Sequence, residues 1–182
     1  MLVLTIPERE LFDESIQEFI NIPETTIRLE HSLVSVSKWE SKWKTPFLLP
    51  RENGFKRGEI IDYVRCMTIS QNVNPVVYSA LTNDELEKVN AYINDEKTAT
   101  TFHEIDGGRQ NRQVVTSELI YYWMCVHQIP WEAQKWHLSR LLTLIRICNN
   151  KAQGSKKMPK SAIMDQNRKL NAARRAKYGT KG

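Results

Sequence analysis

Apolar residues recur at helical spacing over the longest apolar stretch of the chain, residues 116–148. After Pro130 they fall at i, i+3, i+4, i+7 and i+10, the stripe of a helix packed on a core: Leu138, Leu141, Leu142, Ile145 and Cys148. Proline suits the first turn of a helix and disfavours helical geometry at the residue before it. We therefore expect two helices that meet at Pro130, one over residues 118–127 and one running from 131 to 148 without a break.

Similar patterns predict helices earlier in the chain. Ser32 can cap a helix over residues 33–43, in which Trp39 and Trp43 are four residues apart and face the core. A second helix is expected over residues 58–68 and a short helical piece over 76–81. Thr82-Asn-Asp-Glu85 has the form of a capping box. It should start a helix that carries Leu86, Val89 and Ile93, and the segments 45–57 and 97–115 are expected to be loops.

The N-terminal residues show the alternation of strands. Residues 2–6 form a short apolar run closed by Pro7, a turn is expected near residues 13–15, and residues 25–30 alternate apolar and polar side chains. These features predict a small antiparallel sheet of two or three strands that must pack on helices to be stable. The fold class is therefore mostly α with a small N-terminal antiparallel β element, an α+β fold.

The charge divides the chain into two parts. The net charge is +5, but residues 151–182 hold ten Lys or Arg against Asp165 alone. That segment carries +9, which leaves −4 on residues 1–150. We expect one globular domain over 1–150, with the β element at 1–31 and the helical body at 32–150, and a basic extension over 151–182.

The basic extension predicts a binding segment. Residues 162–177 can form a helix with a thin apolar stripe, which we expect to order only on a partner. The positive charges could neutralise phosphates of nucleic acid, or dock on an acidic protein surface, including the body of this protein through self-association. The candidate contact residues are Lys156, Lys157, Lys160, Arg168, Lys169, Arg174, Arg175 and Lys177.

Candidate chemistry is thin along the whole sequence. The four histidines have no metal-site spacing, and Cys125 and His127, two residues apart, face different sides of a helix and so do not suit one zinc ion. Glu104 and Asp106 beside Gly107 and Gly108 are typical of a turn, and no phosphate-binding glycine loop is visible. We therefore expect no catalytic residue, no metal and no cofactor, and no enzymatic activity.

Three sequence features favour a reduced cytosolic setting away from membranes. The cysteines are odd in number, with Cys66 and Cys148 on apolar faces where structural thiols are expected. No signal peptide is evident at the N-terminus. The apolar run at residues 119–126 is shorter than the about 20 residues that a membrane span needs.

The tryptophans and tyrosines of residues 121–136 allow two interpretations. Next to a basic segment, aromatic rings can stack on bases. Aromatic residues within an apolar helical run are more often part of the core. The sequence favours the core, and the alternative remains.

Several stretches resemble a family of small structural-module proteins of tailed bacteriophages. They include Ser32-Leu-Val-Ser-Val-Ser-Lys-Trp-Glu-Ser-Lys-Trp43, Ile120-Tyr-Tyr-Trp-Met124, Ile129-Pro-Trp-Glu-Ala-Gln-Lys-Trp-His-Leu138 and Leu170-Asn-Ala-Ala-Arg-Arg-Ala-Lys177. The plan of the chain is similar to that of tail assembly chaperones, which coat a long helical tape-measure protein before the tail tube forms.

This resemblance implies a non-enzymatic chaperone or scaffold of virion morphogenesis in the host cytoplasm. Its partner would be a tape-measure or other tail protein. Because the chain has more aromatic residues than a core of this size requires, we hypothesise that Trp131 and Trp136, with Trp39 and Trp43 beside them, form the partner-binding surface. Two alternatives remain open. One is a nucleic-acid-binding or packaging accessory protein that uses residues 151–182, and the other is a permanent connector or tail subunit of the virion.

Overall fold

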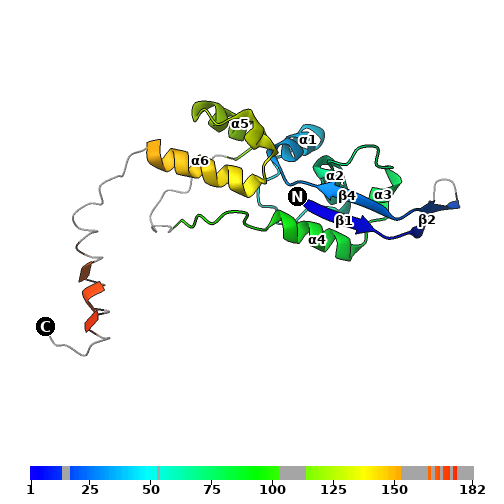
Figure 1. Cartoon of the computed structure of the whole chain (residues 1–182), viewed down its shortest axis with the longest axis horizontal. Coiled ribbons are helices and arrows are strands. Elements are labelled where there is room, and N and C mark those ends of the chain that lie inside the picture. The colour runs from blue at the N-terminus through cyan, green and yellow to red at the C-terminus, as the bar shows by residue number, and fades with distance from the viewer. Residues whose placement is uncertain are drawn as a thin grey trace. The chain divides into compact units, whose positions relative to one another are not determined.

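A computed structural model describes residues 1–13, 17–52, 54–102 and 114–152, together with residues 164, 167–168, 170–172 and 174–175. The chain forms two units, Met1–Arg146 and Ile147–Gly182. The division falls close to the boundary expected at residue 150. In the first unit an N-terminal β-hairpin lies against a set of helices, as the α+β class requires (Figure 1).

The β element is a single hairpin made of two consecutive ladders. Strand β1 (Leu2–Ile6) pairs with β4 (Thr25–Leu29), and β2 (Arg9–Asp13) pairs with β3 (Glu18–Ile22). The register is the same in both ladders, because three further steps beyond the pair Ile6 and Thr25 lead to the pair Arg9 and Ile22.

Two prolines explain why this hairpin is interrupted. Continuing the register places Pro7 opposite Glu24 and Pro23 opposite Glu8. Proline has no N–H to give to a ladder, so both interrupted pairs lack a donor. The sequence predicted the small antiparallel element, but not that its strands divide at these positions.

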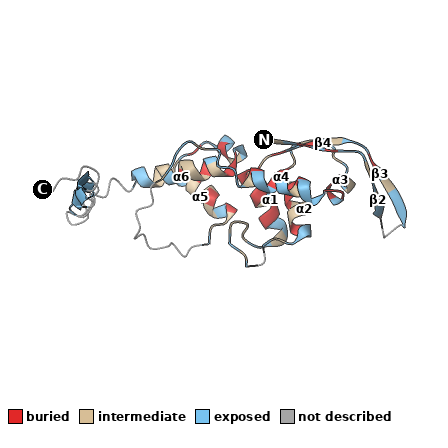
Figure 2. Cartoon of the chain, turned by 90° about the horizontal axis from the view of Figure 1, so that it is seen from below, coloured by how far each residue is buried: buried red, intermediate tan, exposed pale blue. Residues whose placement is uncertain are grey.

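The two halves of the hairpin have different surroundings. In β1 and β4 alternate residues are buried: Leu4, Ile6, Ile27 and Leu29. The distal half, β2 and β3, extends beyond the helices (Figure 1). Figure 2 shows the buried residues gathered where the helices meet one another and the first ladder, while much of the distal half is exposed.

The helices begin largely where the sequence places their caps. Ser32 accepts the Ser35 N–H at the start of α1 (Leu33–Trp43), and Thr82 with Glu85 forms the expected capping box at α4 (Asn83–Ile93). The remaining helices of this region are α2 (Arg57–Met67), α3 (Val76–Ser79) and α5 (Ser117–Val126).

The second arm of the expected helical pair is not one helix, and this prediction was wrong. It divides into a 3-10 helix, η1 (Trp131–Lys135), and α6 (Leu138–Ala152), separated by an extended Trp136 with ψ 162°. The helix is interrupted because residues outside this segment bond to its backbone. His137 forms a β-bridge with Ser32, and the Leu138 N–H donates to the His31 carbonyl at 2.8 Å. A continuous helix would have bonded these groups within itself.

Among the described residues, no helix is long and apolar enough to cross a membrane.

Candidate partner-binding groove

An open groove of about 800 Å³ lies between α2, α4 and the segment of residues 47–55. The two helices line it together with residues 47–51, 54 and 55, which lie outside helices and strands. Val64 and Val89 in its lining are buried, whereas seven other apolar side chains are half-buried or exposed: Phe47, Leu48, Leu49, Phe55, Ile60, Leu86 and Ile93. The groove is therefore an apolar surface that the chain itself leaves partly uncovered.

Aromatic stacking builds the wall of the groove. The Phe47 ring stacks on Tyr63 of α2 with centroids 4.1 Å apart, and on Phe55 at 5.1 Å. Trp39 of α1 meets Phe47 and Phe55 edge-on from behind, at 5.2 and 5.5 Å. Offset and edge-on pairs of this kind contribute about 0.5–1.5 kcal/mol each beyond burial. They hold an irregular segment in one place.

Glu40 fastens the beginning of this segment. Its two carboxylate oxygens accept the backbone N–H groups of Phe47 and Ser117, each at 2.8 Å. The chain reaches Phe47 by ending α1 at Lys44 in the left-handed conformation, with φ 54°. One buried carboxylate of α1 therefore positions both the groove wall and the start of α5.

Arg51 and Glu59 fasten the other end. Arg51 donates to Glu59 at 2.9 Å and to Thr45 at 2.9 Å, and its guanidinium lies 4.6 Å from the Phe55 ring centre. Glu59 also accepts the Lys56 N–H at 2.7 Å. The Lys56 N–H and the Arg51 guanidinium lower the pKa of Glu59 against the opposing effect of burial. The carboxylate is thus fully engaged within the wall.

His31 and Tyr63 are two buried polar side chains in the lining of the groove. The His31 Nδ1 lies 2.5 Å from the Tyr63 hydroxyl, and both side chains are almost completely buried. Burial lowers the pKa of His31 to about 3, and the nearby His137 contributes in the same direction. Burial also raises the pKa of Tyr63. Both groups are therefore neutral near pH 7.

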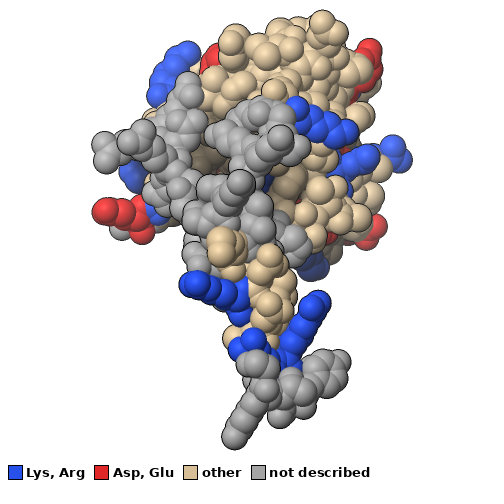
Figure 3. Space-filling view, turned by 90° about the vertical axis from the view of Figure 1, so that its left-hand side faces the viewer, with Lys and Arg blue, Asp and Glu red and all other residues tan. Residues whose placement is uncertain are grey.

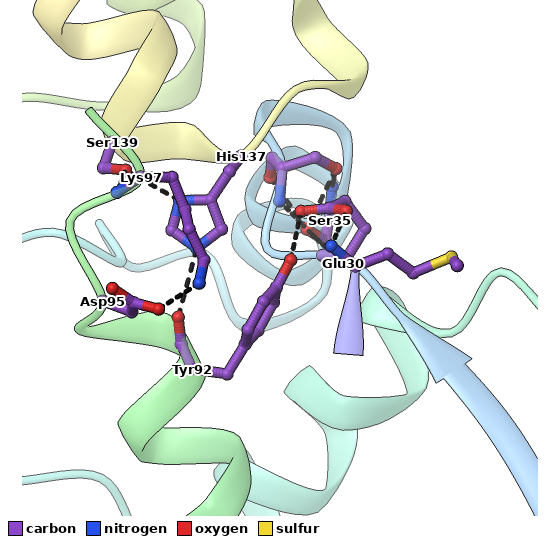
Figure 4. Close-up of polar contacts among 9 residues, drawn as sticks. Glu30, Ser35, Tyr92, Asp95, Lys97, His137 and Ser139 are labelled. Atoms are coloured by element: carbon purple, nitrogen blue, oxygen red, sulfur yellow. Dashed lines mark hydrogen bonds and ion pairs between the residues drawn. The ribbon is translucent and has the colours of Figure 1, made fainter. Parts of the chain in front are cut away.

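Behind His31, a polar network ties α4 to the start of α6. The Tyr92 hydroxyl donates to Glu30 at 2.6 Å, and the His137 ring lies 3.1 Å from the Tyr92 carbonyl and 2.8 Å from the Ser139 hydroxyl (Figure 4). Burial lowers the pKa of His137, although the Tyr92 carbonyl acts in the opposite direction. The His31 and His137 rings are 5.1 Å apart, so protonation of either would oppose protonation of the other.

This arrangement suits binding better than proton transfer. The acidic and basic groups at the base of the groove are already paired with one another, and the pKa values of His31 and Tyr63 lie far from neutrality. The groups that remain accessible are apolar side chains and the polar residues of α4 along the rim: Asn83, Glu87, Asn90 and Asn94.

The structure separates the four tryptophans that the sequence assigns to partner binding. Trp39 has no exposed surface, and its indole N–H donates to the Glu59 carbonyl at 3.0 Å. Its assignment to a contact surface was wrong, because the 47–55 segment covers it. Trp43 is half-buried and stacks on Trp39 at 6.0 Å.

The other two tryptophans lie on the surface. Trp131 is 55% exposed and packs on Tyr121 at 5.8 Å, and Trp136 is 40% exposed beneath the Arg140 guanidinium. None of the four tryptophans lines the groove. A contact role for Trp131 and Trp136 stays a prediction.

The basic extension is described at three of its eight candidate residues. Arg168, Arg174 and Arg175 are exposed helical residues, and Lys and Arg side chains are prominent on this part of the C-terminal unit (Figure 3). The other candidates lie outside the described residues: Lys156, Lys157, Lys160, Lys169 and Lys177.

Two further sequence candidates have definite outcomes. Cys66 is half-buried, and burial with the nearby Asp62 raises the pKa of its thiol, which fits a structural thiol. Glu104, Asp106 and the two glycines after them lie outside the described residues. Within the ranges that the structure describes, no three His, Cys, Asp or Glu side chains are grouped as metal ligands.

Sequence reasoning missed the residues that build the groove wall: Phe47, Arg51, Phe55, Glu59 and Tyr63. One signal was available. Apolar residues within a loop rich in proline and glycine must either pack on the body or remain exposed, and two phenylalanines in one loop favour packing. The sequence could not show which residues the two phenylalanines contact, because Trp39 and Tyr63 lie on the helices before and after the loop.

No protein-family model, no curated protein and no solved structure matches this chain at a significant level.

Proposed function

We propose that this protein is a non-enzymatic chaperone or scaffold that holds an apolar helical segment of a partner protein in the groove. One observation carries the proposal: apolar side chains on both walls stay accessible, while the ionisable groups beneath them are paired. A groove of about 800 Å³ accepts a row of side chains and leaves the rest of the partner outside.

A helix fits the length of the groove. The lining residues of α4 and its C-cap extend from Asn83 to Asn94, which corresponds to about 16 Å at about 1.5 Å per residue. A partner helix of about three turns presents apolar side chains along one face over that distance. Its polar flank would lie along the asparagines and Glu87 of the rim.

The resemblance to phage structural-module proteins supplies the biological setting. In that setting the partner is a tape-measure-like tail protein, whose long helices offer many similar apolar faces. A chaperone needs such a tolerant surface, and half-exposed leucine and phenylalanine side chains meet that need better than a closed cavity.

The test uses two exposed apolar residues with similar accessibility. Leu49 lines the groove and is 44% exposed, whereas Ile69 lies outside it and is 55% exposed. A photo-crosslinking amino acid is placed at either position in cells that produce the phage. We expect position 49, and not position 69, to crosslink to a long helical tail protein.

Charge substitutions at the same positions complete the test. Leu49→Glu should weaken capture of that tail protein at least ten-fold, and Ile69→Glu should leave it unchanged, with both variants folded by circular dichroism. Equal capture by wild type and Leu49→Glu would show that the groove is not the binding site.

A second candidate function rests on the three exposed arginines of the C-terminal unit. Arg168, Arg174 and Arg175 can contact phosphates. In a nucleic-acid-binding protein, affinity for a random duplex should fall steeply between about 50 and 200 mM salt, and the triple glutamine variant should lose binding. Salt-independent binding, or binding that survives the triple substitution, would reject this candidate.

A further inference from the structure

The negative charge of the body is concentrated in residues 8–24, which contain β2 and β3 and are called the distal hairpin below. This segment has six Asp or Glu and one Arg, a net charge of −5. Residues 1–150 together carry −4, so the remainder of the body is close to neutral. The opposite charge, +9, lies in residues 151–182. The chain is therefore acidic at one structural element and basic at another.

One face of the distal hairpin presents two of these charges, those of Glu8 and Glu10, beside two phenyl rings. Strand periodicity and register place Glu8, Glu10, Phe12, Phe19 and Asn21 on the same face. Asn21 donates to Glu8 at 3.1 Å across the strands, which agrees with that placement. The Phe12 and Phe19 rings are 5.1 Å apart and are 47% and 71% exposed.

The opposite face holds the hairpin to the body. Ile22 is buried, Leu11 packs against the core, and Arg9 pairs with Glu85 at the start of α4 at 2.6 Å. Burial of Glu85 opposes its ionisation, but the Thr82 N–H and Arg9 outweigh that effect and lower its pKa. The hairpin is thus anchored on one side.

The charged groups of the outer face lack positive partners within the described parts of the chain. Glu8 and Glu10 are exposed, and neither forms an ion pair with a described residue. Two unpaired carboxylates beside two exposed phenyl rings are suited to a segment that brings cations together with apolar side chains, since Lys and Arg can meet both carboxylate and ring faces.

The C-terminal segment has that composition. Its described helical residues include the exposed Arg168, Arg174 and Arg175, and Met164 and Leu170 are 60% and 49% exposed. Apolar and cationic side chains therefore occur together in it. An acidic hairpin repels nucleic acid, whereas it attracts a segment of this kind.

We propose that the outer face of the distal hairpin, centred on Glu8, Glu10, Phe12 and Phe19, binds residues 151–182 of a second copy of the chain. Such a contact joins two different surfaces, so the pair of copies keeps one unused hairpin face and one unused basic segment, and further copies can add. This self-association does not depend on the proposed function of the groove, which uses other residues.

The first experiment is sedimentation velocity on the full-length protein after nuclease treatment. At about 50 mM salt we expect the sedimentation coefficient to rise with protein concentration, and at about 500 mM salt to return to that of the monomer, because salt screens charge attraction. A protein that stays monomeric at about 100 µM in low salt would overturn the proposal.

Paired variants locate the contact. Glu8→Gln/Glu10→Gln and Phe12→Ser/Phe19→Ser alter the hairpin, and Arg168→Gln/Arg174→Gln/Arg175→Gln alters the C-terminal segment. Each should weaken self-association at least ten-fold. Glu52→Gln/Glu96→Gln removes two exposed carboxylates elsewhere and should leave it unchanged. An equal loss in this control would show a general charge effect and reject the hairpin as the site.

A mixture of the two charge variants gives the decisive result. The hairpin variant retains an intact basic segment, and the C-terminal variant retains an intact hairpin, so an equimolar mixture should form one-to-one dimers that grow no further. If the mixture stays monomeric, the contact between copies does not exist as proposed. If association requires added nucleic acid, the basic segment binds nucleic acid and the proposal fails.

Discussion

The protein contains two groups of aromatic side chains that differ in how they are covered. Trp39, Phe47, Phe55 and Tyr63 interlock at the groove wall with ring centres 4.1–5.5 Å apart. Tyr122, Trp131 and Trp136 lie on the surface of α5 and of the segment after it, outside the groove lining. The first group therefore holds the fold and the groove wall together, and the second is exposed away from the groove.

The difference arises from polar anchors rather than from the rings themselves. Glu40, Arg51 and Glu59 fasten the 47–55 segment over Trp39 at three points. Among the described residues, the aromatic contact of Trp131 is with Tyr121 and the cation contact of Trp136 is with Arg140, both close in sequence. An aromatic ring becomes part of a core when a distant segment is fastened over it.

The largest expected effect is at the covered group. Trp39→Ala should lower the free energy of unfolding by about 3–5 kcal/mol, since it opens a cavity and leaves the Glu59 carbonyl without its indole donor. Urea denaturation measures this change. A loss below about 1 kcal/mol would mean that Trp39 is not the centre of the core.

Acid should lower the free energy of unfolding through protonation of His31, which lies beside Phe47 and Tyr63. The folded pKa of about 3 is lower than the unfolded value near 6.5, so this stabilising contribution is complete above pH 6.5 and is lost as the pH falls toward 3. The free energy of unfolding should fall by up to about 1.4 kcal/mol per pH unit for this histidine. Denaturation curves at pH 7, 6, 5 and 4 measure the slope, and His31→Gln should make it shallower. An unchanged slope in that variant would exclude His31 as the source.

Glu40 connects the two groups, and its substitution should have an intermediate effect. Glu40→Gln replaces one acceptor with an amide donor, so the Phe47 or Ser117 N–H loses its partner at a cost of about 1–3 kcal/mol. Hydrogen exchange at these two amides should become faster, with little change in the centre of α4. Unaltered exchange at both sites would show that other groups hold the segment.

The smallest effect on stability is expected at the exposed group. Trp131→Ala with Trp136→Ala should change the free energy of unfolding by less than about 1 kcal/mol per site, because each ring is 40% or more exposed. The same double variant should abolish partner binding if these rings form a contact surface. Normal capture of the tail protein by a folded double variant would remove them from that role.

Local signals in the sequence predicted much of the fold. The helix caps at Ser32 and Thr82 and the helix end before Pro130 depend on neighbouring residues. In the structure α1 begins after Ser32, α4 begins after Thr82 and α5 ends at Val126. The break before α6 depends on a bridge between His137 and Ser32. Because those residues are distant in sequence, helical spacing alone could not reveal it.

The candidate site was harder to predict for the same reason. The spacing of Trp39 and Trp43 shows that they share a face of α1, but not that residues 47–55 cover that face. The charge difference between body and extension could be read directly from composition. The position of Glu10 on the same hairpin face as Phe12 and Phe19 required the strand register.

The common register of the two hairpin ladders makes the length of this element adjustable. Pro7 and Pro23 separate an inner ladder that belongs to the core from an outer ladder that carries the exposed phenyl rings. Removing or inserting two residues in β2 together with the two facing residues in β3 would change the length of the outer ladder. Each remaining side chain would stay on its original face, because the side-chain period of a strand is two residues. Related proteins could therefore vary how far this arm extends while the inner ladder stays the same.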